Sequence, residues 1–228
     1  LGFDASRDDF TGSITAITDF SDEAFDLLHL ALTDPRFDEE PVSRIKGQIA
    51  TRIISQENDP GTLAGEAFRK SLFADHPYGR DSDGTLETLR SIEPGNLEDF
   101  RARAFARNNL VVGVVGDIDA DRLGMVLDRV FGDLPEADQL TAVTNVQPTY
   151  GDRVSVDLAI PQTTIQFALP GVERDDKDFF AAYLMNHILG GGSFSSRLYE
   201  EIREKRGLAD GVSSYLASYD HAAILGIS

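Results

Sequence analysis

The stretch richest in residues able to contact a ligand is a run of three glycines followed by serine and phenylalanine, at residues 190–194. Glycine has no Cβ, so it ends helices and lets another chain approach the backbone closely. A tight turn between two helices needs one or two glycines, and this run exceeds that need. We therefore predict a loop that contacts a bound molecule, with a simple inter-helix turn as the structural alternative. The predicted contact residues are Gly190, Gly191, Gly192, Ser193 and Phe194.

A charged amphipathic helix is predicted directly after this loop. Leu198 and Ile202 share its buried face at i, i+4 spacing, and charged side chains cover the rest. The planar guanidinium of Arg203 could donate hydrogen bonds to a carbonyl or carboxylate of a peptide. The alternative is an ion pair between Arg203 and Glu200 or Glu204 on the same helix, worth only about 0.3–0.5 kcal/mol.

Strands must position these groups. Residues 212–219, which include Tyr215, read as a strand whose edge could take an extended peptide through main-chain hydrogen bonds. Residues 110–116 are wholly apolar and rich in valine, which predicts a buried strand. Further strands are expected at residues 2–6, 10–17, 154–160, 163–169 and 222–227.

Helical periodicity accounts for most of the remaining chain. The apolar spacing predicts helices over residues 22–33, 41–57, 62–73, 85–91, 96–105, 119–131 and 179–189. Between them, His76-Pro77-Tyr78-Gly79 is rich in turn formers, and we interpret it as a structural turn.

Composition excludes several classes of partner. The net charge of −18 in 228 residues argues against nucleic acid and anionic membranes, which need clustered Lys and Arg, whereas a basic peptide would suit it. No apolar run reaches the ~18 residues of a membrane helix. The chain has no cysteine, so disulfides and thiolate zinc sites are excluded and the compartment stays open. No phosphate-loop motif surrounds the glycines.

The predicted fold class is α+β, with two related units. Each unit would be a mostly antiparallel sheet with helices packed on one face. We place the first unit at residues 1–135, an aperiodic linker at 136–151, and an incomplete second unit at 152–228. A weak internal echo supports two copies, because Ala-Ser recurs at a strand turn at residues 5–6 and 217–218.

These segments together resemble the insulinase/pitrilysin-type metallopeptidases, the inverted zincin family that includes the mitochondrial processing peptidase. The glycine loop with its charged helix, residues 189–208, resembles the opening of that family's second homologous half. The Asp75–Arg80 loop and the Asn108-Asn109 lead into residues 110–116 resemble the later part of its first half. The resemblance covers nearly the whole chain.

Three departures limit the site that the resemblance implies. The family's zinc motif is H-x-x-E-H, yet none of the four histidines, His29, His76, His187 and His221, has a second histidine four residues away. The family's third zinc ligand is a glutamate, and an ungapped match places Arg52 and Ser55 there. A protonated guanidinium has no lone pair for a metal.

The third departure concerns substrate binding. In the family a tyrosine follows the arginine near the glycine loop by seven residues, and the two hold the substrate backbone. Arg203 fits the first position, but Asp210 stands at the second, and Tyr215 on the following strand is the proposed substitute.

The resemblance therefore implies a non-catalytic, peptide-binding subunit of a two-subunit zinc peptidase. No catalytic residue, metal ligand or cofactor is assigned to this chain, and zinc is expected in a homologous partner subunit. Two alternatives remain open. One is an active enzyme whose zinc motif lies upstream of Leu1, and the other is a scaffold that has lost peptide binding, as Asp210 suggests.

Overall fold

The computed structural model describes residues 1–228 and shows an α+β chain with antiparallel sheets, as predicted. Its residues form two compact units. The first unit holds residues 1–50 and 86–142, and the second holds residues 51–85 and 143–228. This grouping by contacts differs from the predicted division at residues 135 and 152, which concerned related halves of the chain and stays a prediction.

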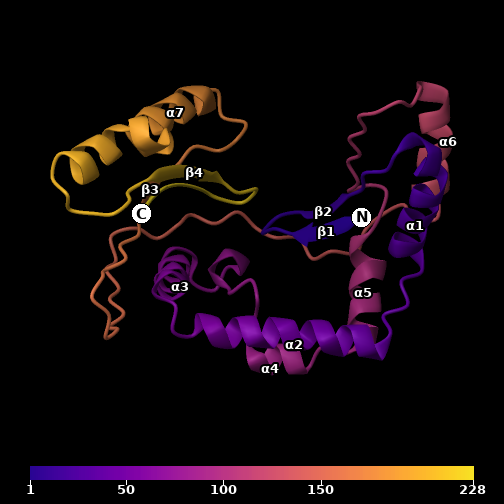
Figure 1. Ribbon diagram of the computed structural model, residues 1–228, viewed down its shortest axis with the longest axis horizontal. Coiled ribbons are helices and arrows are strands. Elements are labelled where there is room, and N and C mark those ends of the chain that lie inside the picture. The colour runs from indigo at the N-terminus through magenta and orange to yellow at the C-terminus, as the bar shows by residue number, and fades with distance from the viewer. The chain divides into compact units, whose positions relative to one another are not determined.

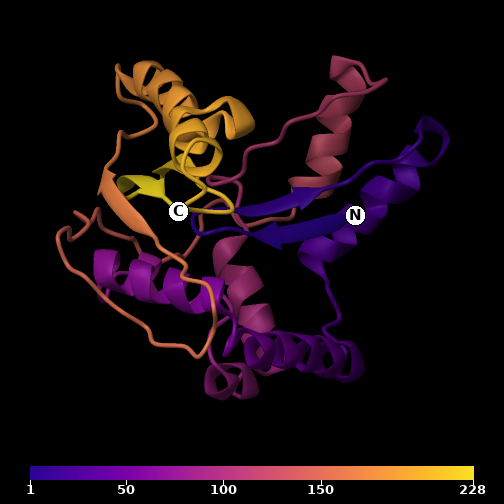
Figure 2. The same cartoon turned by 60° about the vertical axis from the view of Figure 1, so that its left-hand side comes forward.

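The first unit contains a short hairpin and a set of helices (Figure 1). Strands β1 (Gly2–Ala5) and β2 (Phe10–Ser13) pair antiparallel, with Gly2 opposite Ser13, as the sequence predicted. Figure 2 shows them as a separate two-stranded ribbon. The helices of this unit are α1 (Ser21–Thr33), most of α2 (Glu39–Gln56), α4 (Leu86–Arg90), α5 (Pro94–Ala104) and α6 (Ala120–Phe131).

The core of the first unit lies between α1 and α6. Leu32 of α1 packs against Val126 and Val130 of α6, with Leu134 just beyond that helix. Asp119 caps α6, because its carboxylate accepts the backbone N–H of Arg122 at 2.8 Å. Burial of these apolar side chains is the main force that holds the two helices together.

The second unit is built on a three-stranded antiparallel sheet. Strand β5 (Ala223–Ile227) lies in the centre, between β3 (Phe167–Pro170) and β4 (Ser214–Ser218). Helix α3 (Pro60–Phe73) covers one face, and α7 (Phe179–Asn186) lies on the other (Figure 1). Because β5 is the central strand, β4 lies at an edge of the sheet, where an extended peptide could pair with it.

The turn at His76–Gly79 is part of the core of this unit. The Tyr78 ring is 3% exposed, and its hydroxyl accepts the backbone N–H of His221 at 3.1 Å. The side chain of His76 accepts the N–H of Tyr78, and a Cβ at Gly79 would lie 2.5 Å from the carbonyl oxygen of Ala74. The interpretation as a structural turn agrees with these contacts.

Two predicted strands are wrong. Residues 110–116 form no strand, and Val111 and Val115 are 95% and 104% exposed instead of buried. Residues 154–160 likewise have no strand partner, and the strand predicted at residues 163–169 begins only at Phe167. The physical reason is that a strand needs a hydrogen-bonded neighbour on at least one side, and neither segment is paired with a strand.

Candidate functional site

The glycine loop, residues 190–194, lies where α7 ends and is flanked by two π-helical turns. The first, η3 (His187–Gly191), is closed by the Gly192 N–H, which donates to the His187 carbonyl at 2.8 Å. The second, η5 (Tyr199–Glu204), carries Arg203. Such turns hold one extra residue and are frequent at functional sites.

Each of the three glycines has a packing reason. A Cβ at Gly190 would lie 2.5 Å from the Ser214 Oγ, and one at Gly191 would lie 2.7 Å from the Asn186 Nδ2. At Gly192 a Cβ would meet the His187 carbonyl oxygen at 2.7 Å. Close packing therefore suffices to explain the run, so its length no longer argues for ligand contact.

The two residues after the glycines are more accessible. Ser193 has a positive φ of 54°, a conformation that is uncommon for a residue with a side chain. Phe194 is 77% exposed, and its ring meets the buried ring of Tyr199 edge-on, with 5.1 Å between centroids. This loop thus presents an aromatic side chain to its surroundings.

Arg203 is engaged on its own helix. Its guanidinium donates to the Tyr199 hydroxyl and to the Glu204 carboxylate, the latter at 2.9 Å, and lies 4.8 Å from the Tyr199 ring centroid. This includes the pairing that the sequence offered as the alternative. About two fifths of the Arg203 side chain is still exposed, at 41%. The ion pair with Glu204 is exposed and correspondingly weak, so a ligand could replace it.

The side chains of Asp210 and Tyr215 contact groups other than the guanidinium of Arg203. The Asp210 carboxylate accepts from the Gln162 side chain at 3.3 Å and makes no ion pair with Arg203. Tyr215 projects from β4 over Gly226 of β5. Burial raises the pKa of the Tyr215 phenol, as does the neighbouring Tyr219, while Arg69 opposes them.

The zinc position implied by the resemblance does not fit the metal. Arg52 in α2 donates to the Asp83 carboxylate through Nε at 2.9 Å and through Nη2 at 3.1 Å. Ser55 donates to the backbone carbonyl of Arg52 at 2.7 Å. Across residues 1–228 no group of three or more His, Cys, Asp or Glu side chains could hold a metal ion. We derive no chemistry through zinc on these residues.

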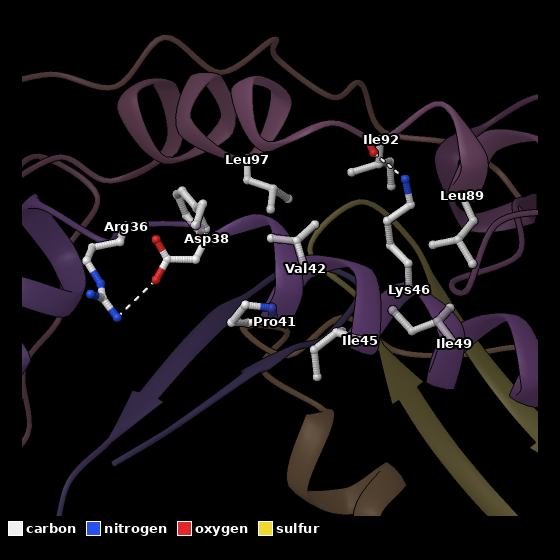
Figure 3. A pocket seen from close by; sticks show the side chains of 11 residues that line it. Arg36, Asp38, Pro41, Val42, Ile45, Lys46, Ile49, Leu89, Ile92 and Leu97 are labelled. Atoms are coloured by element: carbon white, nitrogen blue, oxygen red, sulfur yellow. Dashed lines mark hydrogen bonds and ion pairs between the residues drawn. The ribbon is translucent and has the colours of Figure 1, made fainter.

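A separate pocket of about 460 Å³ lies within the first unit, between the start of α2 and the α4–α5 segment (Figure 3). Its wall is almost wholly apolar, and it is lined by Pro41, Val42, Ile45, Ile49, Leu89, Ile92 and Leu97. Lys46 crosses one end, where its ammonium donates to the backbone carbonyls of Arg90 and Ile92 at 3.1 and 2.5 Å. Arg36 pairs with Asp38 at 2.9 Å, so the charged side chains of the lining are already partnered, and the pocket contains no acid–base or nucleophilic pair.

Sequence reasoning missed two residues beneath the glycine loop. Asn186 and Ser214 are buried and hydrogen-bonded to each other, with Ser214 Oγ donating to Asn186 Oδ1 at 2.7 Å. The one available signal was a polar asparagine within the apolar segment of residues 179–189.

None of the helices is long and apolar enough to cross a membrane.

The antiparallel α+β fold, with its glycine loop packed on an edge strand, agrees with the class of protein that the sequence resembles. The family model described as the peptidase M16 inactive domain matches residues 91–228 of the chain. The chain belongs to the peptidase M16 inactive-domain family.

Named relatives and solved structures agree with this family. The chain is 30% identical over 212 residues to an uncharacterized zinc protease of Streptomyces coelicolor, covering 90% of this chain and 46% of that protein. It is 29% identical over 213 residues to a non-peptidase homolog, YmxG, of Helicobacter pylori, covering 92% and 48%. The crystal structure of a peptidase M16 inactive domain from Pseudomonas fluorescens matches with a TM-score of 0.84 and 32% identity, over 92% of this chain and 51% of that chain. The chain thus spans about half the length of the proteins it matches.

Proposed function

We propose that this chain is the non-catalytic, peptide-binding part of an insulinase-type zinc peptidase. One observation carries the proposal: β4 is an edge strand of the second sheet and lies directly beside the glycine loop. An extended peptide can add to such an edge through main-chain hydrogen bonds. Assignment to an inactive-domain family supports the non-catalytic role.

The proposed ligand-contacting side chains are Arg203, Phe194 and Tyr215. Phe194 is exposed, Tyr215 on β4 is 40% exposed, and Arg203 would exchange Glu204 for a carbonyl or carboxylate of the peptide. The negative charge of −18 favours a basic, unfolded peptide. Zinc would be held outside these residues, by a homologous subunit that completes the catalytic site.

A peptide-binding titration tests this function. The probe is an unfolded lysine- and arginine-rich peptide, and the readout is NMR shifts of backbone amides in the full natural protein. We expect the β4 amides to shift, and Arg203→Ala to weaken binding about tenfold, since a hydrogen bond to a charged group is lost. The matched control is Arg206→Ala, two residues beyond the end of η5, whose side chain bonds Glu201, with a change below about threefold.

The scaffold alternative, which Asp210 suggests from the sequence, is supported by the engagement of Arg203 with Tyr199 and Glu204. It is favoured if the peptide leaves the β4 amides unchanged, and the peptide-binding proposal then fails. Tightly bound zinc at one equivalent in the full natural protein, purified without a partner, would favour the active-enzyme alternative. Zinc that appears only with a co-expressed homologous subunit supports the heteromeric form.

A further inference from the structure

The buried polar side chains of the chain are three, and all lie around the glycine loop. They are Asn186, Ser196 and Ser214, which are 8%, 1% and 3% exposed. Burying a polar group costs free energy unless it is hydrogen-bonded, so buried polar groups are few and usually have a defined purpose. Their concentration at one loop therefore needs an explanation.

Two of the three form a direct connection between α7 and β4. Asn186 is the last residue of α7 and Ser214 is the first residue of β4. The Ser214 hydroxyl donates to the side-chain oxygen of Asn186 at 2.7 Å. Gly190 and Gly191 pack directly on these partners, because a Cβ on either would lie within 2.7 Å of Ser214 or Asn186.

The backbone of this loop is held in an unusual conformation. It begins with the π-helical turn at His187–Gly191 and continues into Ser193 at a positive φ of 54°. The Ser196 hydroxyl is buried without a hydrogen-bond partner. Such features persist only where surrounding contacts fix them. The Asn186–Ser214 hydrogen bond is the buried polar contact available to do this.

We propose that Asn186 and Ser214 are positioning residues for peptide binding. Their hydrogen bond fixes the glycine loop against the first residue of β4, so that a peptide added to the β4 edge meets the loop in one defined position. The two residues do not touch the peptide themselves. This inference rests on the proposed peptide-binding function, but the hydrogen bond's effect on the loop can be measured without any peptide.

The first experiment measures hydrogen exchange of the loop amides in the free protein. Ser214→Ala removes the donor, and we expect the Gly192 N–H, which bonds His187, to exchange about tenfold faster, as for loss of one hydrogen bond. Ser213→Ala is the matched control, because Ser213 is the exposed neighbour whose hydroxyl lies 3.2 Å from that of Ser228. Equal exchange in the two variants would overturn the proposal.

A double variant distinguishes the loss of this one hydrogen bond from a general loss of packing. If Asn186 and Ser214 act only through each other, Asn186→Ala combined with Ser214→Ala should exchange no faster than the more affected single variant. Additive acceleration would show that the two act separately and would contradict the inference.

The last arm adds the basic unfolded peptide. In the natural protein, the peptide should slow exchange of the β4 and loop amides together, whereas in Ser214→Ala it should slow β4 alone. Protection of β4 without the loop in the natural protein overturns the coupling. If the peptide protects neither, the proposed function fails, while the peptide-free exchange still decides whether the hydrogen bond positions the loop.

Discussion

Two apolar stretches of similar composition have opposite surroundings in this molecule. In β5, Ile224 and Leu225 are 1% and 6% exposed. In the segment at residues 110–115, Val111 and Val115 are 95% and 104% exposed. Both sequences favour an extended backbone, so the difference teaches that strand propensity is realised only where neighbouring strands are present.

The neighbours of β5 account for its burial. Ile224 is opposite Pro170 of β3 and Ala217 of β4, and it packs against Leu72 and Phe73 of α3. The 110–115 segment still alternates, since Val112 and Val114 are 42% and 44% exposed between its fully exposed valines. Its side chains therefore alternate in exposure as they would in a strand, but the segment has no strand partner.

The largest expected difference comes from truncating one side chain in each stretch. Ile224→Ala should lower the free energy of unfolding by about 3 kcal/mol, because it leaves a cavity under α3. Val115→Ala should change it by less than about 0.5 kcal/mol. Urea unfolding measures both. A large loss from Val115→Ala would show that this segment is packed in solution.

A matched pair of glycines gives the next test. A Cβ at Gly226 of β5 would lie 2.3 Å from the Tyr215 ring, whereas one at Gly113 would meet nothing within 4 Å. We expect Gly226→Ala to cost about 1–3 kcal/mol as Tyr215 is displaced. Gly113→Ala should be neutral or stabilising by up to about 1 kcal/mol.

The phenol of Tyr215 reports the displacement directly. Its pKa is raised mainly by burial, so moving it into water in Gly226→Ala should lower that pKa toward the ordinary value of 10.0. An ultraviolet titration of the tyrosines follows this change. An unchanged titration curve would mean that the ring was not moved.

Local signals predicted the helices and hairpins well. The helices predicted at residues 41–57 and 62–73 are present as α2 and α3, and Asp59 caps α3 by accepting the Thr62 N–H at 2.7 Å. Gly207 follows η5 and has a φ of 59°, the left-handed conformation that glycine commonly adopts just after a helix. These elements depend on residues a few positions apart, which a sequence displays directly.

The candidate site was predictable only in part. The glycine loop and the edge position of β4 followed from local pattern, but the Asn186–Ser214 hydrogen bond joins residues 28 positions apart. The strand prediction at residues 110–116 is wrong for the same reason, because an apolar run does not reveal which strands it pairs with. Long-range pairing, rather than propensity, was the missing information.

A smaller effect is expected from placing a charge on the exposed stretch. Val111→Lys should leave the free energy of unfolding within about 0.5 kcal/mol of the natural protein, because the side chain already lies in water. It should also raise solubility, since a lysine on an unpaired strand discourages pairing between copies. Turbidity during heating measures this. Unchanged turbidity would indicate that the segment is not the site of association.

The smallest expected effect is a pH dependence of stability that one region has and the other lacks. The 110–115 segment has no ionisable side chain, whereas the helix before β4 carries Glu201. Hydrogen bonds from Lys205 and Arg206 lower the pKa of Glu201 from 4.5 to about 2. A lowered folded-state pKa stabilises the helix above about pH 4.5, and that stabilisation is lost as pH falls toward 2. Amide protection factors in η5 should therefore fall slightly over this range, and Glu201→Gln should reduce the fall. Protection that drops equally in the variant would assign the effect to other carboxylates.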